Sequence, residues 1–179
     1  MEERIVAADP VDDPQGYQRE LLALLGGEDP VKMMAVTPGA FRERADELPA
    51  ELLGRQPEPG EWSVAELLGH LWDTEIALAF RARLVLAQDT PELIAYDQEA
   101  WARLAHPPYA ELLDAFTALR TANLALVRDT PEGQWDRFGI HDERGPTSFR
   151  LLIQTIAGHD RAHLRQLEQT AATVYGAQR

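Results

Sequence analysis

Two histidines stand one helical turn apart in the segment IAGHDRAHLRQL, near the end of the chain. His159 and His163 are four residues apart, so in a helix their imidazoles lie on one face, which they share with Leu152, Ile156 and Leu167. That apolar face is expected to point into the protein. Two buried imidazoles leave ring nitrogens without partners, and two protonated rings would repel each other. A divalent metal ion would resolve both problems, so the spacing favours a metal site over two packed histidines.

A third histidine is expected to point into the same interior from another helix. His70 shares a stripe with Leu67, Leu71 and Thr74, and this stripe also faces the core. Facing helices of a bundle can direct side chains into a common site, so three imidazole nitrogens can meet at one ion. Neutral imidazole suits zinc, nickel, iron or copper. Three protein ligands leave a coordination position open, which is typical of a catalytic site.

The segment HDRAH is similar to the HExxH motif of zinc proteases, in which the glutamate after the first histidine is the general base. Here that position holds Asp160, whose side chain is one methylene shorter, and the third histidine lies upstream on another helix. A protease of this type is therefore not expected. We expect Asp160 to hydrogen-bond a ligand histidine or to face solvent.

Two further residues are candidate catalytic groups. His141 lies in a glycine-rich loop before the last helix, where it is either a surface histidine or an acid, base or substrate contact above the open metal position. Asp97 either caps a short helix or acts as a base or as the partner that orients a ligand histidine. Asp73 and Glu75 follow His70, and for both a solvated helix face is favoured over a hydrogen bond to a ligand imidazole.

The elements that would position these residues are helices. Apolar spacing and helix-end signals predict helices over residues 17–25, 29–48, 63–88, 98–104, 109–130 and 147–176. Ser63 and Glu66 form a capping box at the start of one of them. Thr147 is a candidate N-cap for the last helix, and Pro38 is either a first-turn residue or a kink. No segment shows the alternation of a strand. Four substantial helices predict an all-α four-helix bundle with long connections.

Length and composition limit the class of protein further. The 179 residues fit a flexible acidic tail over residues 1–15 and a single domain over residues 16–179. A net charge of −13 argues against binding to nucleic acid, and a small-molecule substrate is expected instead. No segment has the roughly 20 apolar residues of a membrane helix or the apolar core of a signal peptide, so the cytoplasm is the expected location. Because there is no cysteine, disulfides, thiolate ligands and a cysteine nucleophile are excluded.

Taken together, these segments resemble the DinB-like (DinB/YfiT-type) superfamily of four-helix bundle proteins over about residues 57–169. PGEWSVAELLGHLWDTE contains His70, and GHDRAHLRQL contains His159 and His163. AYDQEAW and HDERGPTS, which contain Asp97 and His141, resemble further segments of one branch of the family. Each motif alone has little specificity, but all of them in this order form a specific pattern.

The resemblance implies that His70, His159 and His163 bind one divalent metal ion, foremost zinc or nickel, with manganese or iron as alternatives. It also implies a homodimer. The activity it implies is that of a thiol S-transferase, which joins a low-molecular-weight thiol such as bacillithiol to a small electrophile, or of a related metal-dependent hydrolase. The alternative is a non-catalytic stress-response protein that binds a metal or a small molecule. For an anionic thiol, Arg81 and Arg83 are the nearest candidate contacts.

Overall fold

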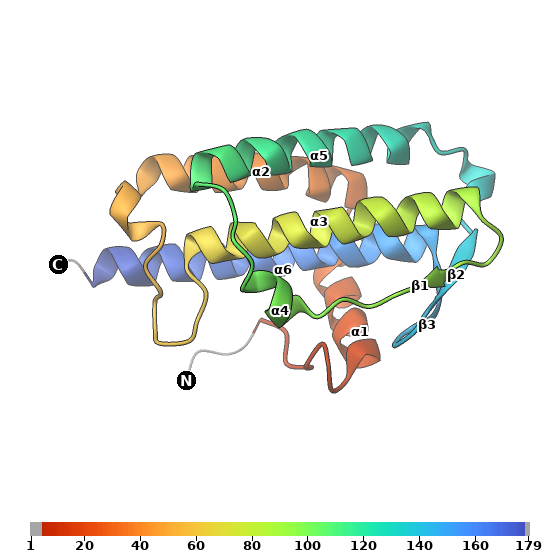
Figure 1. Cartoon of the computed structure of the whole chain (residues 1–179), viewed down its shortest axis with the longest axis horizontal. Helices are drawn as coiled ribbons and strands as arrows, with labels where there is room; N and C mark the ends of the chain where they lie inside the picture. Colours follow the sequence, from red (N-terminus) through yellow and green to blue (C-terminus); the bar gives the residue numbers. More distant parts are fainter. Residues whose placement is uncertain (1–4, 178–179) are drawn as a thin grey trace.

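Four long helices form a bundle in the computed structural model, which describes residues 5–177 (Figure 1). They are α2 (Pro30–Glu47), α3 (Val64–Ala87), α5 (Tyr109–Asp129) and α6 (Phe149–Gly176). The main contacts run around the ring α2, α6, α3, α5. The shorter helices α1 (Pro14–Leu25) and α4 (Gln98–Ala102) pack against α6 and α3, respectively. The predicted helical bundle with long connections is confirmed. None of the helices within residues 5–177 has the length and apolar character that crossing a membrane would require.

Local signals explain most helix ends. The capping box at α3 is present, since Ser63 Oγ accepts from the Glu66 backbone and the Glu66 carboxylate accepts from the Ser63 backbone. At α6 the N-cap is Ser148, whose hydroxyl accepts from the Leu151 N–H, so the predicted Thr147 cap was wrong by one residue. Pro38 lies inside the continuous helix α2.

A small sheet at one end of the bundle contradicts the prediction that the chain has no strands. Its strands β1 (Glu92–Leu93), β2 (Phe138–His141) and β3 (Gly145–Ser148) pair in that order, β1–β2 parallel and β2–β3 antiparallel. Strands of two to four residues are too short to show a period-two pattern, and β1 pairs with a segment far away in the sequence. Gly145, at φ +77°, follows the turn of the β2–β3 hairpin in a conformation that favours glycine.

Two apolar clusters occupy the two ends of the bundle interior. One is formed around Leu68, Phe116 and Leu167, and the other around Val85 and Phe149. Between them, each of the four long helices contributes buried polar side chains. These include Thr37, His70, Glu75, Arg120, Asn123, His159, Asp160 and His163. A polar layer therefore crosses the bundle between its two apolar clusters.

Helix α1 lies directly against the backbone of α6. At Gly158, a Cβ atom would stand 2.1 Å from the carbonyl oxygen of Leu21. Only glycine permits this approach, which places α1 beside the helix turn that carries His159.

Candidate metal centre

Three buried histidines converge within the polar layer. Nε2 of His159 lies 2.9 Å from Nε2 of His70 and 3.1 Å from Nε2 of His163. His70 comes from α3 and the other two from α6, so the structure brings together the three residues that the sequence selected. Nitrogens that share one ion at about 2.1 Å each lie roughly 3.0–3.4 Å apart, so the observed spacing fits a common ligand.

The three nitrogens cannot satisfy one another by hydrogen bonding. The Nε2 atom of His159 contacts both neighbours, but an imidazole nitrogen carries either one proton or one lone pair. It can therefore form only one of the two hydrogen bonds. An ion that accepts all three lone pairs removes this conflict, so the donor set fits a divalent metal ion.

Burial keeps these imidazoles neutral. It is the largest cause that lowers the pKa of His70 and His159, and neighbouring histidines lower both further. Burial also lowers the pKa of His163 to about 4, although the hydrogen bond with Gln166 opposes this shift. At neutral pH the rings are uncharged, which is the form that binds a metal ion.

Gln166 fixes which nitrogen of His163 carries the proton. The Nδ1 atom lies 2.9 Å from the amide oxygen of Gln166, one turn further along α6. Because that oxygen only accepts, Nδ1 must donate, and Nε2 keeps its lone pair for a ligand. The Nδ1 atoms of His70 and His159 are buried and have no hydrogen-bond partner among residues 5–177.

A pocket of about 680 Å³ gives access to this cluster. His70 and His163 lie in its wall, as do Tyr17 of α1 and Trp62 of the loop before α3. The Trp62 ring lies 4.7 Å from the His70 ring, centroid to centroid. Residues of the N-terminal segment also contribute, namely Ile5, Val6, Ala8, Asp9 and Pro10. The pocket has room for a small molecule beside the histidines.

The two candidate catalytic residues lie outside the lining of this pocket. His141 ends strand β2 and is buried, and its Nδ1 accepts from the Glu143 N–H at 3.3 Å. Asp97 is exposed and caps α4, where its carboxylate accepts from the Ala100 N–H at 2.9 Å. Their catalytic roles stay predictions.

For three acidic residues the prediction from the sequence was wrong. Asp160 neither faces solvent nor contacts a ligand histidine, because it is fully buried and accepts from Arg120 and from Thr37 Oγ1. Glu75 is also fully buried, with Arg120 Nε at 2.8 Å. Asp73 is buried as well and lies 3.2 Å from a ring nitrogen of His106. The sequence did contain one signal, since Arg120 occupies an apolar stripe of α5.

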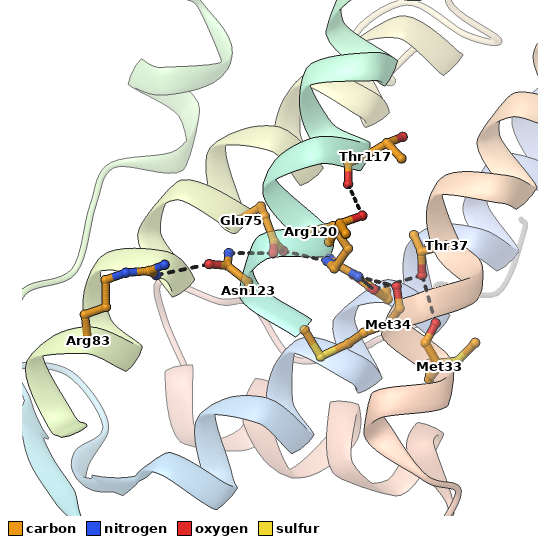
Figure 2. Close-up of polar contacts among 10 residues, drawn as sticks. Met33, Met34, Thr37, Glu75, Arg83, Thr117, Arg120 and Asn123 are labelled. Atoms are coloured by element: carbon orange, nitrogen blue, oxygen red, sulfur yellow. Dashed lines mark hydrogen bonds and ion pairs between the residues drawn. The ribbon is translucent and has the colours of Figure 1, made fainter. Parts of the chain in front are cut away.

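The resulting network joins all four long helices (Figure 2). Thr37 comes from α2, Glu75 from α3, Arg120 from α5 and Asp160 from α6. Figure 2 shows that the series of hydrogen bonds continues from Glu75 to Asn123. The Asn123 amide donates to the Glu75 carboxylate at 2.7 Å. Because the network has one member on each helix, it fixes how far each helix is shifted along its axis relative to the others. It also fixes the position of the α6 turn that carries His159, since Asp160 directly follows His159.

Opposing effects set the charges of this network. Burial alone would lower the pKa of Arg120, but the carboxylates of Asp160 and Glu75 outweigh it, and the pKa is raised. Burial raises the pKa of Glu75, while Arg120 and Asn123 lower it. The guanidinium is therefore charged and compensated by its two partners.

Comparisons with known proteins agree with this architecture. A family model described as "DinB superfamily" matches residues 33–167. Two proteins of Oceanobacillus iheyensis, named "Putative metal-dependent hydrolase" OB0413 and OB0782, are similar to this chain. The first is 24% identical over 140 residues, covering 77% of this chain and 81% of the relative. The second is 26% identical over 132 residues, covering 73% and 77%.

The fold is also found among solved structures. YfiT from Bacillus subtilis, described as a probable metal-dependent hydrolase with an unusual four-helix bundle topology, matches with a TM-score of 0.73 and 18% identity. The match covers 89% of this chain and 88% of that one. This likeness supports the four-helix arrangement described above.

Proposed function

This chain belongs to the DinB superfamily, and we propose that it is a metal-dependent enzyme whose ion is held by His70, His159 and His163. The observation that carries the proposal is the convergence of three buried Nε2 atoms beside a pocket. The names of the Oceanobacillus iheyensis relatives agree with it. The ion is a divalent transition metal, foremost zinc or nickel.

The residues of this chain have distinct tasks in such a centre. Gln166 keeps His163 in the tautomer that binds, and Trp62 covers one side of His70. A bound divalent ion would lower the pKa of a water molecule or thiol and polarise an electrophile. Three protein ligands leave room for such a group, and His70 and His163 present it to the pocket.

Hydrolysis of a small substrate is the reaction we propose first, since both relatives are named as hydrolases. Thiol transfer is the second candidate, because a pocket of about 680 Å³ has room for a low-molecular-weight thiol and an electrophile together. The two reactions are distinguished by their co-substrate. A transferase consumes a thiol and an electrophile in equal amounts, whereas a hydrolase acts in the absence of thiol.

Metal content is the first test. Elemental mass spectrometry of the tag-free protein should find one equivalent of transition metal, which His159→Ala should lose. His106→Ala is the matched control, since this histidine lies outside the cluster and contacts Asp73. A wild-type protein that takes up no zinc, nickel, manganese or iron would refute the proposal.

Activity of the metal-loaded protein is the second test. Activated esters and amides are assayed without thiol, and small electrophiles are assayed with and without a low-molecular-weight thiol. Turnover that is lost in His159→Ala and kept in His106→Ala would support an enzyme. Stoichiometric metal without turnover in either assay would favour the non-catalytic binding protein instead.

A further inference from the structure

Two arginines approach each other where the β2–β3 hairpin meets α3, and neither forms an ion pair with any residue in the range 5–177. Arg81 of α3 donates to the Ile94 carbonyl at 2.6 Å. Arg144 lies in the turn of the hairpin, and its Nε atom is buried without a hydrogen-bond partner. Both arginines are half-buried, and an oxyanion is a suitable partner for a partly buried guanidinium.

The hairpin turn is fixed in place by Asp142. The carboxylate of Asp142 accepts from the Ala95 N–H at 3.0 Å, which attaches the turn to the segment after β1. That segment carries Tyr96, whose hydroxyl lies 2.9 Å from Thr74 Oγ1 and whose ring lies 5.7 Å from the Arg81 guanidinium carbon. The turn that carries Arg144 is thus held beside the segment that Arg81 contacts through the Ile94 carbonyl.

The positive charge of the two arginines also acts on neighbouring groups. Burial lowers the pKa of Arg81, and the charge of Arg144 lowers it further, while Asp142 and Glu143 only partly oppose this. Burial lowers the pKa of His141 to about 4, and Arg144 and Arg81 again contribute. His141 is therefore neutral at pH 7, although two acidic residues follow it in the sequence.

His141 adds an unused hydrogen-bond donor. Its Nδ1 lies 3.3 Å from the Glu143 backbone nitrogen and 3.1 Å from Asp142 Oδ1, and in the neutral tautomer in which Nδ1 accepts from the Glu143 N–H the proton is on Nε2. That Nε2 atom is buried and has no partner among the described residues. A buried donor without an acceptor is costly, and an anion beside the two arginines would provide the acceptor.

Arg81 and His70 lie on one face of the same helix. Thr74 and Arg81 lie four and eleven residues beyond His70 and on the same face of α3, so Arg81 is about 16 Å further along the axis. The charge of Arg144 contributes, after burial and the neighbouring histidines, to the lowered pKa of His159. It also opposes the burial that raises the pKa of Tyr17, which lines the pocket.

We infer that Arg81, Arg144 and His141 form a subsite for an oxyanion group of the substrate, a carboxylate or a phosphate. The anionic group is held away from the reacting group, which lies at His70, His159 and His163. The substrate class is therefore a small molecule with an anionic group at some distance from the bond that reacts. This inference rests on the proposed function for its substrate, but the anion subsite consists only of side chains of this chain.

Anion binding to the metal-free protein tests the subsite directly. The protein is treated with a chelator, so that no anion can bind through a metal, and is titrated calorimetrically with inorganic phosphate and with succinate at constant ionic strength. We expect one anion per chain, bound about tenfold or more weakly by Arg144→Gln and by Arg81→Gln, because each variant loses a charge-assisted contact. Stronger binding of phosphate or of succinate identifies the preferred oxyanion.

Arg128→Gln is the matched control, since this arginine is exposed at the end of α5 and the substitution removes the same charge. The Arg128→Gln substitution should change the affinity for phosphate and the affinity for succinate less than twofold. An equal loss in the control, or no binding of either anion to the wild type, would overturn the inference.

Stability provides a second measurement that does not depend on finding the right anion. Removing one of two like charges should raise the urea midpoint of Arg144→Gln in a buffer without phosphate or carboxylate, and not that of Arg128→Gln. A lowered midpoint for Arg144→Gln would count against an unpaired cation. Metal content separates the two proposals: anion binding without metal uptake refutes the metal centre, and metal uptake without anion binding refutes the subsite.

Discussion

Replacing Arg120 with methionine should lower the free energy of unfolding by about 3–5 kcal/mol, the usual cost of removing one partner from a buried ion pair. Methionine fills much of the same space and has no polar atom to donate. Glu75 then keeps only the donor from Asn123, and Asp160 keeps only Thr37 Oγ1. The Met34 carbonyl, which accepts from Arg120 at 2.8 Å, loses that donor too.

The loss should depend on pH in a direction that the structure determines. Burial already raises the pKa of Glu75 in the wild type, where Arg120 opposes it, and the variant lacks that opposition. A carboxyl group whose folded pKa exceeds its unfolded value stabilises the protein below the unfolded pKa, and this contribution is lost as pH rises through the folded pKa. The difference between variant and wild type should therefore be larger at pH 8 than at pH 5.

Urea unfolding of the metal-free proteins, followed by circular dichroism, measures this quantity. Arg42→Met is the control, because its ion pair with Asp114 is 2.7 Å long but exposed, and its loss should cost less than about 1 kcal/mol. If Arg120→Met itself does not fold, the triple variant with Glu75→Gln and Asp160→Asn should restore folding, since it removes both unpaired charges. A loss below about 1 kcal/mol for Arg120→Met, or a difference that shrinks as pH rises, would refute the reasoning.

Three further predictions follow from single contacts. Gly158→Ala should lower the free energy of unfolding by about 1–3 kcal/mol in thermal unfolding, since its Cβ would clash with the Leu21 carbonyl, and an unchanged melting temperature would contradict this. Gln166→Leu should weaken metal binding about 10–100-fold in a chelator competition, because His163 loses the acceptor that fixes its tautomer; equal affinity would argue against that role. Burial lowers the pKa of His163 and His141 to about 4, so at these two residues only the unfolded chain takes up protons as pH falls below about 6.5. The free energy of unfolding of the metal-free protein should therefore decrease from pH 6.5 to pH 4, and a flat profile in this window would exclude that explanation.

The sequence predicted the helices because the signals for a helix are local. The Ser63–Glu66 capping box and the apolar spacing of α3, α5 and α6 act within a few residues of each other, so they can be read without knowing the fold. The same holds for His159 and His163, whose common face follows from their separation along one helix. The orientation of His70 could also be predicted, because its helix stripe is apolar.

Only the tertiary structure decided which side chains became partners. Glu75 and Asp160 look like ordinary solvated acids in the sequence, and they are buried because Arg120 reaches them from a third helix. The sheet forms because β1 pairs with β2, far away in the sequence, and its hairpin brings the turn that carries Arg144 to the segment after β1, which Arg81 contacts. Helix formation depends on neighbours along the chain, whereas the burial and pairing of a charge depend on neighbours in space, and those exist only once the helices have packed.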